Sequence, residues 1–398
     1  MTLALESLYG RIGDLDSHES ISTPHYPEIF GEIGRRLVED YPAMWRRLEQ
    51  AGMDNGEPPE SRITLDIPDN KPITQEAVWT LKGASAPGAI NMDRRTAVMD
   101  EMGIQRQLIF PLMGIVGWIM SAGGGQIGFP VSTKEDVELG KRAIDAYNKW
   151  AGKLTQKYKG RMWVVGMLQS GLPEMTPELM VEKAEELIAS GCKAIQISSG
   201  EPPAGVSPGD RRLDPFYALL ARKYVTLTFH PPSGMAYRKS DIWEAGVLDM
   251  RWAGVSIMHQ PEENFIAMLI LGGVFDRHPM LRVAVVESGA HWVGPLAERL
   301  DLGSIADTPA DHSKLSMKPS GFLGRNVRVS TMVKEPVEVW FQRWPHLQDV
   351  YCYSSDYPHA EGGKWSLNRL FERVAPLGDN IVEKFFVNNS QFVLPAAA

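Results

Sequence analysis

Cysteine is scarce in this chain of 398 residues, which contains only Cys192 and Cys352. Both lie in apolar segments typical of strands, which argues against a disulfide framework and favours a reducing compartment. The first residues lack the basic segment and long apolar run of a signal peptide. The apolar stretch 265–274 is too short to span a bilayer. We therefore expect a cytoplasmic protein.

A surplus of positive charge is also missing. The net charge is -8 at pH 7, which gives no basic footprint for nucleic acid or an anionic membrane. Hydrophobic residues make up 43% and charged residues 23% of the chain, as in folded globular proteins and unlike disordered ones. The expected partner is therefore a small-molecule substrate.

What the sequence does contain is a regular alternation of apolar runs and helical patterns. Counting the segment that leads into Asp14, eight runs have the character of buried parallel strands; the other seven are 107–111, 163–168, 192–197, 225–230, 281–287, 327–331 and 351–355. Helical patterns separate most of them. This order predicts an α/β fold, a (β/α)8 TIM barrel, formed as a single domain by residues 1–398.

Two long segments do not read as barrel strands. Residues 26–88 are expected to form an insertion or cap after the first strand, with a helix over 29–52 and with Trp45 and Trp79 as packing anchors. Residues 111–130 are rich in Gly, Met and Trp, with three glycines at 123–125. Placed after a strand, this second segment is either a mobile apolar lid or a surface loop packed by its own side chains.

Polar residues stand where several of the predicted strands end. Asp16 and His18 lie two residues apart, so an extended backbone places both side chains on one face. His230 ends the fifth strand and Asp356 follows the eighth. Strand ends converge in such a barrel, and two imidazoles with two carboxylates suit one divalent ion such as Zn²⁺ or Mn²⁺. A lone histidine at a strand end is more often a packing or capping residue, but four compatible strand-end residues favour a site.

Four motifs give the chain a family resemblance: Asp14-x-Asp16-x-His18, His230-Pro231-Pro232, the run from Gly273 to Leu281, and Ser355-Asp356-Tyr357-Pro358-His359. The sequence resembles the amidohydrolase superfamily, in the branch that contains aminocarboxymuconate-semialdehyde decarboxylase and γ-resorcylate decarboxylase. The resemblance implies metal ligands at Asp16, His18, His230 and Asp356, and a homo-oligomer, a dimer or larger. Asp14 shares the strand face one step deeper and is expected to be a structural carboxylate.

Two departures from the family pattern concern the metal and the acid/base residue. Binuclear members carry a carboxylated lysine at the end of strand 4, but here Lys193 stands at the start of that strand, which favours a single ion. Strand 6 of many relatives ends in a catalytic histidine, whereas this one ends in Glu287. Either Glu287 takes that position or His291, one turn later, reaches into the site.

Three further residues are candidates for binding substrate. Arg94 lies in a segment that in related decarboxylases supplies an arginine, whose planar group matches a carboxylate; the alternative is an exposed helix arginine. Trp118 would give the apolar surface that an aromatic substrate needs. His359, three residues after Asp356, is either a partner of that carboxylate or a ligand for a substrate oxygen.

These residues support two enzymatic hypotheses. The first is a metal-dependent, non-oxidative decarboxylase of an aromatic or unsaturated carboxylic acid, in which Asp356 or His291 protonates the ring carbon. The alternative is a hydrolase of an amide, lactone or carbon-carbon bond, in which metal-activated water attacks and Asp356 accepts its proton. The same four ligands serve both reactions. A barrel that only binds its ligand is disfavoured by the complete ligand set.

Overall fold

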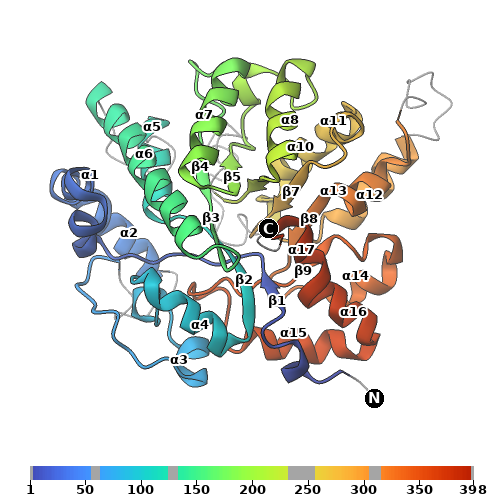
Figure 1. The fold of residues 1–398 in the computed structure, drawn as a ribbon, viewed down its shortest axis with the longest axis horizontal. Helices are drawn as coiled ribbons and strands as arrows, with labels where there is room; N and C mark the ends of the chain where they lie inside the picture. The colour runs from blue at the N-terminus through green and yellow to red at the C-terminus, as the bar shows by residue number, and fades with distance from the viewer. Residues whose placement is uncertain (1–2, 55–62, 124–132, 232–255, 304–314, 396–398) are drawn as a thin grey trace.

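A computed structural model describes residues 3–54, 63–123, 133–231, 256–303 and 315–395. In this part of the chain a ring of parallel strands is surrounded by helices (Figure 1). The strands are β1 (Ile12–Asp14), β2 (Ile104–Ile109), β3 (Met162–Val164), β4 (Gly166–Leu168), β5 (Ala194–Ile197), β6 (Thr226–Phe229), β7 (Arg282–Val285), β8 (Val327–Ser330) and β9 (Tyr351–Cys352). Their positions agree with the eight predicted runs, because β3 and β4 are halves of one strand.

The strands form two sheets, β1-β2-β3 and β4 to β9, and further backbone hydrogen bonds join these sheets into one ring. Val165, between β3 and β4, donates its N–H to the carbonyl of Ile109 on β2 at 2.9 Å. On the other side, Leu15 donates to Tyr353 at 3.1 Å, and Ser17 forms a parallel bridge with Tyr357. The predicted (β/α)8 barrel is therefore confirmed.

The helices on the outside begin and end at residues that suit those positions. Thr133 forms a capping box at the start of α6 (Lys134–Lys157). Thr176 caps α7 (Pro177–Ser190), which has Pro177 at its first position, and Gly191 ends this helix at φ 112°. The other helices of the barrel wall are α4 (Arg95–Met102), α8 (Asp214–Lys223), α10 (Gln260–Leu271), α11 (Val274–Arg277), α12 (Val293–Gly303), α13 (Pro319–Asn326), α14 (Val337–Arg343), α15 (Ser366–Val374) and α16 (Asp379–Glu383). No described helix is both long and apolar enough to cross a membrane.

The segment after β1 forms two helices where one was predicted over 29–52. α1 (Tyr26–Asp40) and α2 (Pro42–Asp54) are separated at Tyr41, which has non-helical dihedral angles, and α3 (Gln75–Thr80) follows. Trp45 and Trp79 are buried, as expected of packing anchors. Arg36 of α1 pairs with Glu135 of α6 at 3.0 Å, so this segment packs against the barrel wall. Its treatment as a cap on a single domain stays a prediction.

The prediction of a loop over 111–130 is wrong for its first half, which forms the buried helix α5 (Met113–Ser121). Glycine at this contact does not form a loop but allows α5 to lie against α6. A Cβ at Gly117 would stand 2.9 Å from the carbonyl oxygen of Gly140, and one at Gly140 would stand 2.6 Å from the nitrogen of Ser121. Glycine is needed there for close helix packing. Positions 124–130 of the predicted lid lie outside the described residues.

The C-terminal segment fills the N-terminal end of the barrel. α17 (Asn389–Val393) lies near the centre of the ring in Figure 1. Val393 and Leu394 belong to the cluster of apolar side chains that the strands enclose. The hydroxyl of Thr226 donates to the carbonyl of Val393 at 2.7 Å, and Arg106 donates to that of Leu394 at 3.1 Å. This end of the barrel is closed, so a site must lie at the other end.

Candidate metal centre

Asp16 and His18 lie on the chain that continues β1 beyond its last residue. This segment stays extended because it pairs on both sides: His18 bridges to Phe110, and Ser17 bridges to Tyr357. The alternation of side chains then points Asp16 and His18 the same way. Asp16 Oδ1 lies 3.3 Å from His18 Nε2, and both residues are 1% exposed.

His230 and Glu287 enter the same space from β6 and β7. His230 Nε2 lies 2.7 Å from Glu287 Oε2 and 3.8 Å from Asp16 Oδ1. Glu287 Oε2 is also 3.9 Å from His18 Nε2. Glu287 thus follows β7, which is the sixth strand predicted from the sequence. It stands at the position for which the sequence left two candidates, Glu287 and His291.

Asp356 and His359 complete the cluster from the loop after β9. Asp356 Oδ1 lies 3.4 Å from His18 Nε2 and 3.2 Å from His359 Nδ1. The ring of His359 stacks on that of His18, with centroids 3.7 Å apart. The side chain of His359 is 26% exposed and that of Asp356 is 12% exposed, so the histidine lies on the solvent side of the carboxylate.

The backbone is strained at both carboxylates that follow a strand. Glu287 has φ 58° and Asp356 has φ 52°, in the left-handed region that side chains with a Cβ rarely adopt. Such conformations cost on the order of 1–3 kcal/mol and persist where surrounding contacts enforce them. Here the N–H of Glu287 donates to the hydroxyl of Ser330 at 2.9 Å, and that of Asp356 donates to the carbonyl of Asp16 at 2.9 Å. The sharp turns direct both carboxylates into the cluster.

The donor atoms of the cluster fit a divalent cation. The ligand atoms of Asp16, His18, His230 and Glu287 all lie within 4.8 Å of one another, as do those of His18, Glu287, Asp356 and His359. Asp16 Oδ1, His18 Nε2 and Asp356 Oδ1 are buried, and none of the described residues forms a hydrogen bond with them. Buried lone pairs that face each other without a proton donor are unfavourable unless a cation binds them.

The charges of the cluster shift the pKa values of its members in opposite directions. Burial raises the pKa of Asp16 well above its usual value, and the carboxylates of Asp356 and Glu287 raise it further. Burial alone would also raise the pKa of Asp356, but His359 and His18 outweigh burial and lower it. The pKa of His359 is raised despite burial, because Asp356 stabilises its charged form. A cation would relieve the repulsion among the three carboxylates.

Asp14 forms hydrogen bonds with the segments that carry the cluster. Its carboxylate accepts hydrogen bonds from the N–H and the hydroxyl of Ser355, at 2.8 and 2.6 Å, and from the side-chain amide of Gln107 at 2.8 Å. Burial raises the pKa of Asp14 to about 6. Asp14 therefore joins β1 to β2 and to the turn that presents Asp356, which is a structural task.

Three predicted site residues make their contacts elsewhere. Arg94 forms an ion pair with Asp69 and donates to that residue's carbonyl at 2.6 Å. Trp118 is buried on α5, where its carbonyl accepts a hydrogen bond from the side chain of Gln169. The side chain of His291 is 43% exposed and lies 3.5 Å from Glu335. Roles for these three residues in binding or catalysis stay sequence-based predictions.

Two further buried residues position the cluster, a role that the sequence indicated for neither of them. Arg95 donates to the carbonyl oxygens of His18 and Gly88. Glu19 accepts the N–H groups of Met113, at 3.1 Å, and of Leu112, and so fixes the start of α5 against the end of β1. Neither residue belongs to a periodic pattern, so only its adjacency to Arg94 or His18 could have drawn attention to it.

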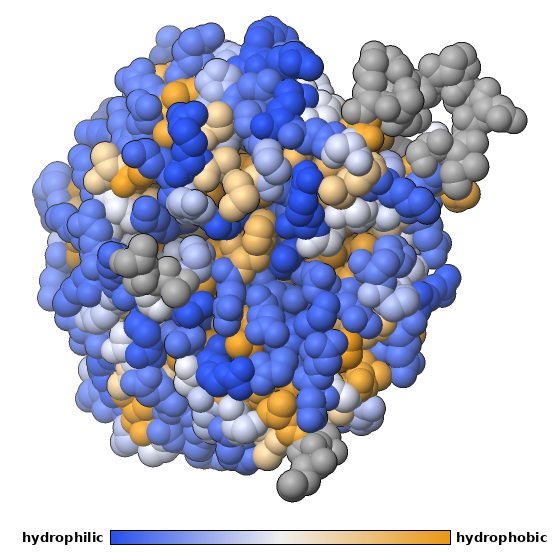
Figure 2. Space-filling model, turned by 45° about the vertical axis from the view of Figure 1, so that its right-hand side comes forward, coloured by the Kyte–Doolittle hydropathy of each residue, from blue (hydrophilic) through white to orange (hydrophobic). Residues whose placement is uncertain are grey.

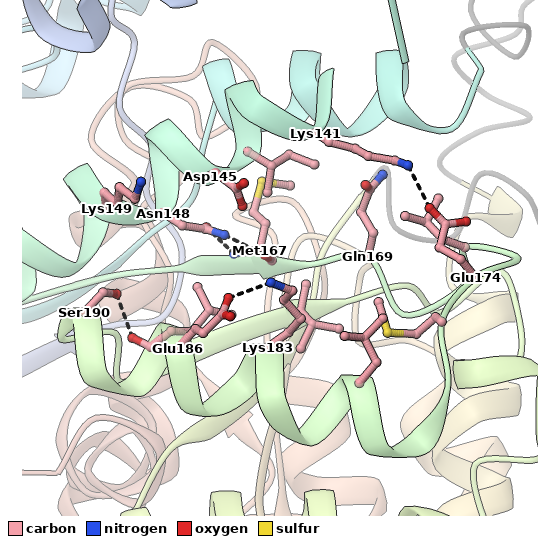
Figure 3. Close-up of a pocket in the computed structure, with 16 residues that line it drawn as sticks. Lys141, Asp145, Asn148, Lys149, Met167, Gln169, Glu174, Lys183, Glu186 and Ser190 are labelled. Carbon is pink, nitrogen blue, oxygen red and sulfur yellow. Dashed lines mark hydrogen bonds and ion pairs between the residues drawn. The ribbon is translucent and has the colours of Figure 1, made fainter. Parts of the chain in front are cut away.

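A hollow of about 480 Å³ lies away from this cluster, between α6 and α7 beside β4 (Figure 3). Its charged rim is largely paired within itself: Lys141 binds Glu174 at 2.8 Å, and Lys183 binds Glu186 at 2.7 Å. Asn148 donates to the carbonyl of Met167 on β4. Because its rim is internally paired, this hollow lacks the uncompensated donors of the cluster.

Solved structures share this fold at low sequence identity. An amidohydrolase from Mycobacterium avium subsp. paratuberculosis K-10 matches with a TM-score of 0.65 and 20% identity, over 96% of this chain and 99% of that one. A 5-carboxyvanillate decarboxylase from Novosphingobium aromaticivorans DSM 12444, solved with manganese and 3-methoxy-4-hydroxy-5-nitrobenzoic acid, gives 0.56 and 20%, over 99% of each chain. A 2,6-dihydroxybenzoate decarboxylase complexed with 2,6-dihydroxybenzoate gives 0.56 and 14%, over 96% of this chain and 99% of that one.

The family assignment comes from the sequence itself. Residues 123–395, well over half of the chain, match the family model described as amidohydrolase. The matched region contains His230, Glu287 and Asp356, and the barrel brings Asp16 and His18 to them from outside it. The chain therefore belongs to the amidohydrolase family and is an enzyme with a candidate metal site.

Proposed function

We propose that this enzyme is a non-oxidative decarboxylase of an aromatic carboxylic acid that uses one divalent ion, Mn²⁺ or Zn²⁺. Asp16, His18, His230 and Asp356 would hold the ion. The observation that carries the proposal is the convergence of buried oxygen and nitrogen donors at the C-terminal end of the barrel, where Asp16 Oδ1 and His18 Nε2 have no hydrogen bond from the described residues. Two proteins of similar fold bind aromatic carboxylates, one of them together with manganese, which supports this substrate class.

When bound, the ion would supply a Lewis acid that polarises oxygen atoms of the substrate. The proton is the task of the protein. His359, whose charged form Asp356 stabilises, holds this proton, and Asp356 passes it to the ring carbon that bears the carboxylate. The bond to the carboxylate then breaks, its electron pair restores the aromatic ring, and CO₂ leaves.

His359 returns the proton to Asp356 in this scheme. Its Nδ1 lies 3.2 Å from Asp356 Oδ1, and its ring is the more exposed of the two side chains. Stacking on His18 holds the ring in that orientation. Glu287, 2.7 Å from His230, orients that imidazole and is the second candidate for the acid. His291 remains a third, predicted from sequence alone.

Direct assay separates decarboxylation from hydrolysis. The metal-stripped protein, reloaded with Mn²⁺ or with Zn²⁺, is incubated with 5-carboxyvanillate, 2,6-dihydroxybenzoate and other hydroxybenzoates, and CO₂ release is measured. We expect CO₂ with at least one of these acids and none from the metal-free protein. Turnover of amides or lactones by the same preparations, with no CO₂ from any acid, would show that the enzyme is a hydrolase.

A further inference from the structure

Lys82 lies in a segment that closes over the loop after β9. The N–H of Gly83 donates to the carbonyl of Pro358 at 2.8 Å, and the ammonium of Lys82 donates to the carbonyl of Gly363 at 2.6 Å. Lys82 is 8% exposed. The segment that contains it comes from between β1 and β2, so two distant parts of the chain meet here.

The loop that binds Lys82 is packed directly on Asp356. A Cβ added at Gly362 would stand 2.4 Å from the carbonyl oxygen of Ser355 and 3.0 Å from Cβ of Asp356. Gly363, whose carbonyl accepts from Lys82, is the next residue. The ammonium is therefore held by the same turn that presents Asp356 to the cluster.

The ammonium of Lys82 has no ion-pair partner in the part of the chain that the structure describes. Among the residues that the structure describes, no carboxylate forms an ion pair with this ammonium, whereas Arg94, the predicted substrate cation, is paired with Asp69. An ammonium has three donors, and one is used by Gly363. Burying an unpaired charge is unfavourable, so such a group indicates an anion that binds from outside the chain.

Electrostatics agree with an ammonium that is charged near neutral pH. Burial lowers the pKa of Lys82 to about 8, and Asp356 and Glu361 oppose that shift. The side chain of Glu361 is 62% exposed, which leaves Asp356 as the buried opposing charge. The positive charge of Lys82 thus lies beside the cluster without being neutralised by it.

We propose that Lys82 is the cation that binds the carboxylate of the substrate and sets the preference of the site for anionic aromatic acids over neutral analogues. This inference rests on the proposed function, since it assigns a residue to the same site. Arg94, the other candidate cation, forms an ion pair with Asp69. The ammonium at Gly363 has donors left for a carboxylate and is held by the loop that packs on Asp356.

Binding of a matched pair of ligands tests the assignment. The probes are 2-hydroxybenzoate and 2-hydroxybenzamide, which differ in the carboxylate, and their dissociation constants are measured by calorimetry on the Mn²⁺-loaded enzyme. Lys82→Gln keeps a donor for Gly363 and removes the charge. We expect it to weaken 2-hydroxybenzoate by about 10- to 100-fold and 2-hydroxybenzamide by less than about 3-fold. Each ligand is compared between the variant and the unsubstituted enzyme, so the contribution of the ion to its binding cancels.

Three variants serve as controls. Lys364→Met removes an exposed lysine next to Gly363 and should leave both dissociation constants unchanged. Lys82→Arg should restore part of the preference for the carboxylate, and Lys82→Met replaces the glutamine variant if that protein does not fold. Bound metal, measured by elemental analysis, should be equal in all of them.

Equal weakening of both ligands, or no weakening of either, in the Lys82 variants would overturn the inference. So would loss of the preference in Arg94→Met with Lys82 intact. CO₂ release followed in the same samples keeps the two proposals apart. Absence of CO₂ from every acid, with the ligand preference still dependent on Lys82, would count against decarboxylation alone.

Discussion

The two ends of the barrel use buried polar groups in opposite ways. At the N-terminal end, Arg106 and Arg328 donate to carbonyl oxygens of the C-terminal segment, and Leu394 fills the space between the strands. At the C-terminal end, Asp16 Oδ1 and Asp356 Oδ1 are buried with no hydrogen bond from the described residues. Arg106 and Arg328 thus bind the chain itself, whereas the two carboxylate oxygens at the other end are available to a ligand.

This difference separates residues that stabilise the fold from residues that serve its chemistry. Strained backbone also occurs at the C-terminal end, at Glu287 and Asp356, where it directs carboxylates into the cluster. The exposed surface adds little to the contrast: on the face in Figure 2, hydrophobic residues form small patches among polar ones. In a barrel of this type, loss of a group at one end should reduce activity, and loss at the other should reduce stability.

Removing the proton donor should have the largest effect on activity. Asp356→Asn keeps the size of the side chain but removes its acid, so we expect CO₂ release to fall by roughly 10²- to 10⁴-fold. Thermal unfolding should change little. His291→Ala is the matched comparison, because the side chain of His291 is 43% exposed and pairs with Glu335. A full loss of activity in His291→Ala, with Asp356→Asn active, would move the acid role to His291.

A substitution at the opposite end should destabilise the protein and spare its chemistry. Leu394 is fully buried inside the strands. We expect Leu394→Ala to lower the free energy of unfolding by about 2–5 kcal/mol, measured in urea, because it leaves a cavity. CO₂ release per folded molecule and metal content should match the unsubstituted enzyme. A fall in metal content at unchanged stability would remove the distinction between the two ends.

Glu262, at the start of α10, should make stability depend on pH. Its side chain accepts from the hydroxyl of Ser199 at 2.8 Å, and burial raises its pKa to about 7. The folded state thus binds a proton that the unfolded chain releases near pH 4.5. This contribution is complete below pH 4.5 and is lost as pH rises to 7, by about 3 kcal/mol. In Glu262→Gln the change in unfolding free energy between pH 5 and pH 8 should be smaller by most of that amount; an equal change in both proteins would show that Glu262 titrates normally.

The sequence predicted the barrel because its strands are buried on both faces and therefore appear as apolar runs, as at Val283–Val286. It also predicted that Asp16, His18, His230 and Asp356 would meet, since strand ends converge whatever their separation in the chain. Helix α5 was missed because Gly114 and Gly117 resemble loop residues. Their purpose, close packing against neighbouring elements, depends on a partner that no local pattern identifies.

The details of the site depended on contacts that sequence does not encode locally. The sequence did not show that a left-handed backbone places the carboxylate of Glu287 2.7 Å from His230. Nor did it show that Arg94 forms an ion pair with Asp69. Lys82 carried no motif, and only the fold brings it to Gly363. Each of these contacts joins residues that lie far apart in the chain.

Metal binding tests the central claim most directly. The Mn²⁺ content of the dialysed protein is measured by elemental analysis for the unsubstituted enzyme, for His230→Ala and for His346→Ala, which alters an exposed histidine that is not part of the cluster. We predict about one ion per chain in the unsubstituted enzyme and in His346→Ala, and less than about a tenth of that in His230→Ala. Equal metal content in all three proteins, or none in the unsubstituted enzyme, would contradict the account.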